Sequence, residues 1–408
     1  MTEQDKFAVQ KLINAAKENG FNVENGKLRR TSSRFCLGVE HGDYNGTELF
    51  GVGTDRFIWL AYKPNGTKTN RFFSVNFPDD GIIKFEIGKS PEPKTVPDSW
   101  ARFPFGVDYI LHREGYELST GIDAVLYGNI PGGGMSRSAS LALNLILTIF
   151  DVNNIEIENQ NRIVDIAQMV ENDYIGSPCG ILDQTMILFA KEGMGTHYNP
   201  TDRSIKYIPL GKTDVDFRIV SLDTGTVRPG LEKSTYKIRR EECDQFAAMA
   251  KSEFKISCLA DVKTKELYDK IISRYEISHP DLCERLTYIF NAQQRFYKML
   301  NAWKKGDIVT IGKIFRQDGI ELRDKYKISG AELESMCDIA RTVGGVFGER
   351  MLGGGDKGAA GAIVRADAVA ALVSAVELAY PRSHPELSDK FAVHSCKIVD
   401  GVKTWELH

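Results

Sequence analysis

The chain has 408 residues, 42% of them hydrophobic, and a formal net charge of -3 at pH 7. This length exceeds what one hydrophobic core usually supports, so we expect two lobes. Acidic and basic residues are interspersed, which leaves no basic stripe for nucleic acid and no polybasic patch for a membrane surface.

The N-terminal stretch MTEQDKFAVQKLINAAKENG predicts an amphipathic helix with charges along its whole length. It contains no apolar core of signal-peptide length, and no later segment is long enough to span a bilayer. The seven cysteines are scattered singly, without a C-x-x-C pair or a histidine cluster at metal spacing, so we expect reduced thiols and no structural zinc. These features together predict a cytoplasmic protein.

The first half of the chain predicts a sheet followed by mixed helices and strands. Between residues 34 and 87, short apolar and aromatic runs alternate with Asn-Gly and Pro-Asp-Asp turns, which is typical of an open mixed or antiparallel sheet. The pattern then predicts, in chain order, helix 99–113, strand 124–127, helices 137–150 and 159–174, and strands 186–190 and 217–221.

The second half is mainly helical. Apolar residues at helical spacing predict helices over 231–250, 264–275, 280–303 and 307–325. A strand, glycine loop and strand unit over 346–364 and a helix over 367–380 follow. We therefore predict an α+β protein with a tightly packed N-terminal lobe, residues 1–212, and C-terminal lobe, residues 213–408.

The stretch IPGGGMSRSASLALNLILTIF is the most informative segment. Gly132, Gly133 and Gly134 let the backbone turn tightly and approach a ligand. The helix that follows points free N–H groups and its positive dipole end toward that ligand, which favours phosphate. Ser136 and Ser138 add hydroxyls that can reach a phosphate oxygen or a magnesium ion. The structural alternative is a glycine-rich turn with a serine N-cap.

The segment RFCLGVEHGDYNG places four polar side chains in one strand and the turn after it: Arg34, Glu40, His41 and Asp43. Carboxylates and an imidazole supply the paired hydrogen bonds that the hydroxyls of a sugar require. The alternative is an exposed polar turn, for which DYNG is suitable chemistry.

The segment ENDYIGSPCGILDQ contains a carboxylate at the end of a helix, a glycine-containing turn and a second carboxylate. This arrangement suits a magnesium ligand, Glu171, and a general base, Asp183. The alternative is that Asp183 only caps the helix-like run that follows it.

The segment STYKIRREEC predicts the start of a helix. Tyr236 can leave the helix face there, and the basic pair Arg239 and Arg240 can pair with acids elsewhere. By itself the segment is also simply a charged helix.

The segment RMLGGGDKGAAGAIV contains a literal G-x-G-x-x-G at Gly353, Gly355 and Gly358. A dinucleotide fingerprint would open a helix, whereas these glycines lead into a strand, so the pattern excludes a Rossmann site. Such a loop can still line a phosphate or substrate pocket by close backbone approach. The sequence contains no G-x-x-x-x-G-K-S/T loop, which excludes a P-loop enzyme.

Taken in order, the five segments resemble the galactokinase family of the GHMP sugar kinase superfamily. They are similar to its sugar signature, phosphate loop, magnesium and base segment, Tyr-x-x-Arg-Arg segment and third glycine motif. The most specific matches are EHGDYNG and CGILDQ. The resemblance implies a two-lobe GHMP kinase fold, with mixed or antiparallel sheets, packed helices and an active site in the cleft between the lobes.

The resemblance also implies roles for individual residues, with ATP and Mg²⁺ as cofactors. Asp183 would accept the proton of the C1 hydroxyl of the sugar, and Arg34 would orient Asp183 and offset charge on the phosphoryl group. Ser138 and Glu171 would hold Mg²⁺. The sugar hydroxyls would be contacted by Glu40, His41, Asp43, Gly180 and Tyr236. The ATP phosphates would be held by Gly132, Gly133, Gly134, Ser136 and Ser138.

The sequence also departs from the family pattern. The phosphate loop PGGGMSRSA is one residue shorter than P-x-G-x-G-L-S-S-S-A and places Arg137 within the serine run. Val39 and Cys36 replace a glycine and an asparagine of the sugar signature, and the third glycine motif carries Asp356 and Lys357 as new charges. These changes bear on the sugar and on nucleotide affinity more than on the reaction class.

The resemblance predicts conversion of galactose to galactose 1-phosphate by a monomer or weak oligomer. Galacturonate is the main alternative substrate, since Lys357 or Arg137 could bind its carboxylate. Glu40 opposes it, because two like charges about 4 Å apart cost about 1 to 4 kcal/mol. Arabinose, N-acetylgalactosamine and a non-catalytic galactose and ATP sensor are the remaining alternatives. Trp100 is the candidate contact for the nucleotide base.

Overall fold

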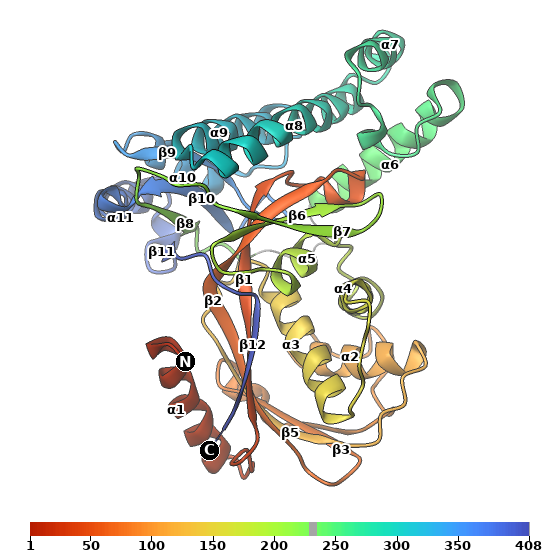
Figure 1. Ribbon diagram of the computed structural model, residues 1–408, viewed down its shortest axis with the longest axis vertical. Coiled ribbons are helices and arrows are strands. Elements are labelled where there is room, and N and C mark those ends of the chain that lie inside the picture. The colour runs from red at the N-terminus through yellow and green to blue at the C-terminus, as the bar shows by residue number, and fades with distance from the viewer. Residues whose placement is uncertain (228–234, 408) are drawn as a thin grey trace.

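The computed structural model describes residues 1–227 and 235–407, and its strands form two sheets (Figure 1). The larger sheet contains β1 (Lys27–Gly38), β2 (Leu49–Pro64), β3 (Thr69–Ser74), β4 (Ile83–Glu86), β5 (Ile122–Gly128), β6 (Met194–Asn199), β7 (Ser204–Pro209) and β12 (Val402–Glu406). Their order is β12-β1-β2-β5-β3-β4, with β6 paired to β2 and β7 paired to β6. Strand β3 runs parallel to β5, whereas β1 and β2 pair antiparallel, so this sheet is mixed.

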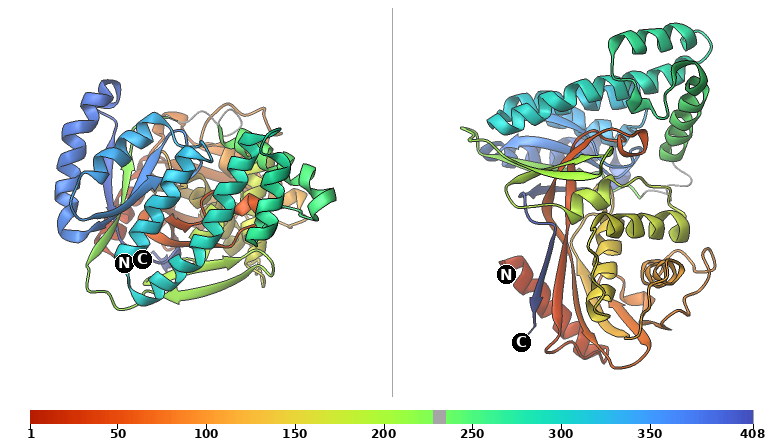
Figure 2. Two further views of the ribbon diagram at one scale, coloured as in Figure 1. Left: turned by 90° about the horizontal axis from the view of Figure 1, so that it is seen from above. Right: turned by 45° about the vertical axis from the view of Figure 1, so that its right-hand side comes forward.

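Helices cover both faces of the larger sheet. Helix α1 (Glu3–Glu18) packs on one face through Leu12, which shares a hydrophobic cluster with Trp59 of β2. Helices α2 (Arg102–Arg113), α3 (Arg137–Val152) and α4 (Asn161–Met169) pack on the other face, where Leu60 points. Successive side chains of a strand alternate between its faces, and β2 is apolar on both because both are covered. Figure 2 shows the two helical layers on opposite sides of the long strands.

The second sheet is antiparallel and belongs to the later part of the chain. It has the order β11-β8-β10-β9 and contains β8 (Phe217–Asp223), β9 (Val346–Met351), β10 (Ala359–Arg365) and β11 (Ala392–Cys396). The helices around it are α6 (Thr235–Phe254), α7 (Lys265–Tyr275), α8 (Pro280–Lys305), α9 (Ile308–Asp324), α10 (Ala331–Arg341) and α11 (Val369–Ser383).

One large hydrophobic core joins the two sheets. Phe35 of β1 and Phe50 of β2 belong to the same cluster as Leu222 of β8 and Ile363 of β10. The ring of Phe35 stacks on that of Phe315 in α9, with 5.2 Å between the ring centroids. Strands β1 and β2 therefore connect the two helical regions rather than belonging to one of them (Figure 1).

Most predicted elements are confirmed, with shifts of a few residues at their ends. The predicted strand over 186–190 is wrong, because residues Leu182–Leu188 form helix α5. Its run of apolar residues is too short for periodicity to separate a strand from a buried helix. The sequence analysis missed helix α10 and strands β6, β7, β11 and β12. The predicted start of helix 231–250 lies outside the described residues, and α6 begins at Thr235.

Strand β12 returns to the first sheet, where Val402 is opposite Thr31 of β1 in the antiparallel register. A strand from the C-terminal half of the chain therefore belongs to the sheet of the N-terminal half. The division into lobes at residue 212 remains a prediction. In the described part of the chain, no helix is both long enough and apolar enough to cross a membrane.

Candidate active site

Arg34 and Asp183 form a close pair that joins β1 to α5. Arg34 lies in β1 and its side chain is almost fully buried, while Asp183 lies in the first turn of α5. The Nε atom of Arg34 donates to Oδ1 of Asp183 over 2.7 Å, and Nη2 lies 2.7 Å from the same oxygen. The Nη1 atom donates to the carbonyl of Gly134 over 2.9 Å. One buried guanidinium therefore fixes both a carboxylate and the glycine loop.

The EHGDYNG turn is not the exposed polar turn of the alternative interpretation. Glu40 and His41 are 2% and 3% exposed. The turn continues into a single 3-10 turn over Asp43–Asn45, which ends at Gly46 in the left-handed conformation. The amide of Asn45 donates to the carbonyl of His41 over 2.8 Å, which closes the turn from inside.

Asp43, Gly180 and Tyr236 meet although they lie far apart in the sequence. Asp43 Oδ2 accepts the backbone N–H of Leu182 over 3.0 Å. A Cβ atom at Gly180 would lie 1.8 Å from the same oxygen, so only glycine fits there. The backbone N–H of Gly180 donates to Oη of Tyr236 over 3.2 Å. Burial raises the pKa of Asp43, while the Leu182 hydrogen bond and Arg240 lower it.

The two glycine loops pack directly on each other. A Cβ atom at Gly133 would lie 2.4 Å from Cα of Gly358, and one at Gly353 would lie 3.4 Å from Gly134. The predicted strand, loop and strand unit is confirmed, because β9 and β10 pair antiparallel on either side of the second loop. The close approach of the two backbones leaves no room for a side chain at Gly133, whereas Gly353 is favoured by its left-handed backbone conformation, with φ 68°.

The phosphate loop ends in the first turn of α3. Ser136 precedes the helix in the left-handed conformation, with φ 55°, and its side chain makes no capping bond. Its buried Oγ atom has no hydrogen-bond partner among the described residues. Ser136 therefore takes the N-cap position of the alternative interpretation, but its side chain does not cap α3.

Glu171 and Ser138 lie on facing helical segments. Glu171 belongs to a π-helical turn that continues α4 over Val170–Ile175, and it is 4% exposed. Its Oε2 atom accepts from Nε2 of Gln184 over 2.8 Å and from Sγ of Cys179 over 3.0 Å. Burial raises the pKa of Glu171 to about 7, although hydrogen bonds from Ser138 and other side chains lower it.

A cavity of about 740 Å³ brings all of the predicted site residues together. This volume is typical of sites for small molecules and cofactors. Its lining includes Arg34, Glu40, His41, Asp43, Gly132, Gly133, Gly134, Ser136, Ser138, Glu171, Gly180, Asp183 and Tyr236. Arg137 and Trp100 also line it, whereas the described lining does not include Asp356 or Lys357.

One part of the cavity is apolar, and of its residues the sequence analysis identified only Trp100. Phe77 and Phe103 line it together with Trp100, and Ile58 and Leu126 contribute aliphatic surface. The buried Nε1 atom of Trp100 has no hydrogen-bond partner in the described ranges. These residues come from four separate segments, so only the folded sheet brings them together.

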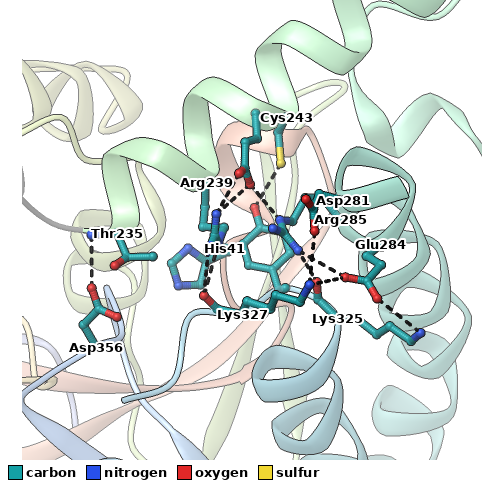
Figure 3. Close-up of polar contacts among 12 residues, drawn as sticks. His41, Thr235, Arg239, Cys243, Asp281, Glu284, Arg285, Lys325, Lys327 and Asp356 are labelled. Atoms are coloured by element: carbon teal, nitrogen blue, oxygen red, sulfur yellow. Dashed lines mark hydrogen bonds and ion pairs between the residues drawn. The ribbon is translucent and has the colours of Figure 1, made fainter. Parts of the chain in front are cut away.

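The two arginines of the Tyr236 segment, Arg239 and Arg240, make different contacts. Arg239 pairs with Glu242 of its own helix at 2.8 Å and donates to the carbonyl of Lys327 over 3.1 Å (Figure 3). Arg240 donates to the carbonyl of Cys179 over 3.3 Å rather than to a carboxylate. Both arginines therefore attach α6 to neighbouring segments.

Asp356, a departure from the family pattern, contacts the start of α6. Its Oδ2 atom accepts the backbone N–H of Thr235 over 3.1 Å (Figure 3). This N–H is one of the donors that a helix leaves unsatisfied at its N-terminus, and a carboxylate is favourable there. Since Tyr236 is the next residue, Asp356 links the second glycine loop to the side of the cavity that Tyr236 lines.

Comparisons with known proteins identify the fold and the family. A family model described as GHMP kinases N terminal domain matches residues 106–191. A mevalonate kinase from Methanococcus jannaschii shares the fold, with a TM-score of 0.60 and 16% identity over 91% of this chain and 98% of the other. The fold class is therefore that of the GHMP kinases, as predicted.

Relatives with higher sequence identity show which family of GHMP kinases the chain belongs to. A galactokinase from Clostridium beijerinckii is 31% identical over 84% of this chain and 86% of its own length. A galactokinase from Exiguobacterium sibiricum is 30% identical over 91% of this chain and 92% of its own length. The crystal structure of Lactococcus lactis galactokinase with galactose has a TM-score of 0.88 and 26% identity, covering 97% of this chain and 99% of the other. The chain belongs to the galactokinase family, so it is a sugar kinase that uses ATP.

Proposed function

We propose that this enzyme transfers the γ-phosphoryl group of ATP to the anomeric C1 hydroxyl of galactose, giving galactose 1-phosphate and ADP. The observation that carries this proposal is the Arg34 and Asp183 pair, because it places a carboxylate and a buried cation beside two packed glycine loops. The galactokinase relatives, including the one crystallised with galactose, support the choice of sugar.

Asp183 is the proposed general base. It is partly exposed to the cavity, so a sugar hydroxyl can reach it, while Arg34 holds its Oδ1 atom in place. Asp183 would take the proton of the C1 hydroxyl as that oxygen attacks the phosphorus atom. Arg34 would offset negative charge that builds up on the phosphoryl group.

The proposed phosphate site is the loop before α3. Its glycines and Ser136 would hold the phosphates through backbone N–H groups and a hydroxyl. Arg137, which departs from the serine run of the family's phosphate loop, adds a cation to this part of the cavity. The apolar part of the cavity would take the nucleotide base, with Trp100 as a contact and as a donor through its Nε1 atom.

The residues present fit a magnesium ion. Mg²⁺ usually binds one or two carboxylates and completes its shell with water and phosphate oxygens. Glu171 supplies one such carboxylate, and Ser138 supplies a hydroxyl beside it. When bound there, the ion would neutralise charge on the phosphates.

The sugar hydroxyls are the proposed ligands of Glu40, His41, Asp43, Gly180 and Tyr236. The negative charge of Glu40 disfavours galacturonate, the main alternative substrate. Arg350 Nη2 lies 3.3 Å from Glu40 Oε2 and offsets part of that charge, which weakens the argument. Of the two cations suggested for the carboxylate of galacturonate, only Arg137 is among the described cavity residues.

The experiment that tests the function is ADP release from Mg·ATP with galactose, galacturonate, arabinose and N-acetylgalactosamine, using Asp183→Ala as the control. Turnover of galactose that the control abolishes is the expected result. Preferred turnover of another of these sugars would keep the mechanism and change the substrate. Tight binding of galactose and ATP without ADP release would favour the sensor. A cytoplasmic location and a monomeric or weakly associated state remain predictions.

A further inference from the structure

His41 is connected to a buried chain of hydrogen-bonding groups behind the cavity. Its Nδ1 atom lies 2.9 Å from Oη of Tyr44, and that oxygen lies 2.8 Å from Oη of Tyr326. Tyr326 Oη also contacts Nδ2 of Asn45 at 3.2 Å and Sγ of Cys243 at 3.2 Å. Tyr326 and Cys243 are 0% and 2% exposed, so the contact between their side chains is shielded from water. Figure 3 shows Cys243 on α6 above His41.

The orientation of the Asn45 amide is fixed by its other partner. Its nitrogen donates to the carbonyl of His41 over 2.8 Å, and a carbonyl can only accept. The atom facing Tyr326 is this same nitrogen, which can only donate. Tyr326 Oη must therefore accept from Asn45, and it has one proton to give.

That proton has two possible acceptors, Tyr44 and Cys243. The contact with Tyr44 has the length of a normal O–H···O hydrogen bond, and a thiol sulfur is a weak acceptor. Tyr326 therefore donates to Tyr44, and the thiol of Cys243 donates to Tyr326. Among the described residues, the other contact of Tyr44 Oη is Nδ1 of His41, so the Tyr44 proton has that nitrogen as its acceptor.

We infer that this chain fixes His41 as the neutral tautomer that accepts at Nδ1 and carries its proton on Nε2, and that Tyr326 is the positioning residue that sets this state. Burial raises the pKa of Tyr44 and that of Tyr326 well above the ordinary value, so both keep their protons.

The consequence for recognition rests on the proposed function. His41 and Glu40 are neighbours that both line the cavity. With its proton on Nε2, His41 is a donor on the side away from Tyr44, while Glu40 is an acceptor. A sugar hydroxyl both donates and accepts, whereas a carboxylate only accepts. The pair therefore favours a hydroxyl over the carboxylate of a uronic acid.

The direct test is the tautomer of His41 in the protein without ligands. Nitrogen-15 histidine labelling, with His41→Gln to assign the resonance, is measured at about pH 8, above the ordinary histidine pKa. The expected spectrum has an unprotonated Nδ1 and a protonated Nε2. A proton on Nδ1, alone or together with one on Nε2, would overturn the inference. This spectrum requires no substrate, so its outcome is independent of which sugar is phosphorylated.

Two variants separate positioning from general destabilisation. Tyr326→Phe keeps the ring and removes the donor to Tyr44, so the KM for galactose should rise about three- to tenfold while the KM for ATP stays within about twofold. Cys243→Ala removes only the terminal donor and should leave the tautomer unchanged. Tyr275→Phe is the matched control, because its hydroxyl donates to the Met249 carbonyl in a contact separate from this chain.

If Tyr326→Phe and Tyr275→Phe raise the KM for galactose equally, Tyr326 has no positioning role. A His41 tautomer that is the same in wild type and in Tyr326→Phe would also contradict the role assigned to Tyr326.

Discussion

Arg350 and Glu40 form an ion pair in the interior, with 3.3 Å between Nη2 and Oε2 and with both residues at most 2% exposed. Burial raises the pKa of Glu40, while Arg350 and Arg34 lower it. Arg350 also donates to the carbonyl of Cys36 over 2.8 Å, which ties β9 to β1. Arg350 therefore stabilises the negative charge of Glu40, one of the proposed sugar-binding residues, in a buried position that would otherwise disfavour that charge.

Removing Arg350 should leave Glu40 as an uncompensated buried charge. We expect Arg350→Met to lower the free energy of unfolding by about 3 to 5 kcal/mol, measured by urea denaturation. The double variant Glu40→Gln with Arg350→Met should recover part of this loss, since it removes the second charge as well. Losses that simply add in the double variant would show that the two side chains are not coupled.

Asp356 should act on the sugar through α6. Asp356→Ala removes the acceptor of the Thr235 N–H, so we expect the KM for galactose to rise about fivefold as Tyr236 loses its fixed position. Asp356→Asn keeps an acceptor oxygen and should stay close to wild type. Steady-state kinetics with both substrates checks this. An asparagine variant as impaired as the alanine variant would mean that the charge, and not the hydrogen bond, matters.

Asp183 should be required for chemistry but not for folding. Its carboxylate is partly exposed, and Asp183→Asn preserves its shape, so the fold should persist as judged by circular dichroism. We expect kcat to fall by a factor of about 10² to 10⁴, the usual contribution of a general base, while the KM for galactose changes little. A variant that retains more than about a tenth of the wild-type kcat would exclude Asp183 as the base.

Glu171 should make the stability of the metal-free protein depend on pH. Its folded-state pKa of about 7 lies above the ordinary value of 4.5, so the folded state binds the proton more tightly than the unfolded state. The resulting stabilisation is complete below about pH 4.5 and is lost as the pH rises through about 7, by about 3 kcal/mol in total.

The measurement is urea unfolding with EDTA, for wild type and Glu171→Gln, between about pH 5 and about pH 8. As the pH rises, wild type should lose unfolding free energy relative to Glu171→Gln. Added Mg²⁺ should stabilise wild type at the upper end of this range. Parallel pH profiles of the two proteins would contradict the assignment.

The sequence predicts the fold class well because its helices are long and periodic. Residues 280–303, for example, were predicted as a helix and form most of α8. Helix α5 and strand β12 were not predicted, for different reasons. The apolar run of α5 covers only two turns, and β12 is defined by its pairing with β1, more than 370 residues away in the chain.

The cavity residues were predicted where a motif keeps them close in sequence. Glycine, serine and carboxylate positions carry their chemistry in short segments, so the resemblance identified them. Arg350 lies at the start of the third glycine motif, but the motif alone does not indicate its role, because its partner Glu40 lies in the turn after β1. Phe77 and Phe103 carry no local pattern at all, and only the sheet places them beside Trp100.

The pairing of β12 with β1 also constrains how the protein is made. Residues 27–31 of β1 keep an open backbone edge until residues 402–406, more than 370 positions later, have been synthesised and pair with them. An unpaired edge of this kind can pair with the strand of another chain. A nascent or truncated chain that lacks residues 402–406 is therefore exposed to aggregation, even though every described residue of the candidate cavity has already been synthesised.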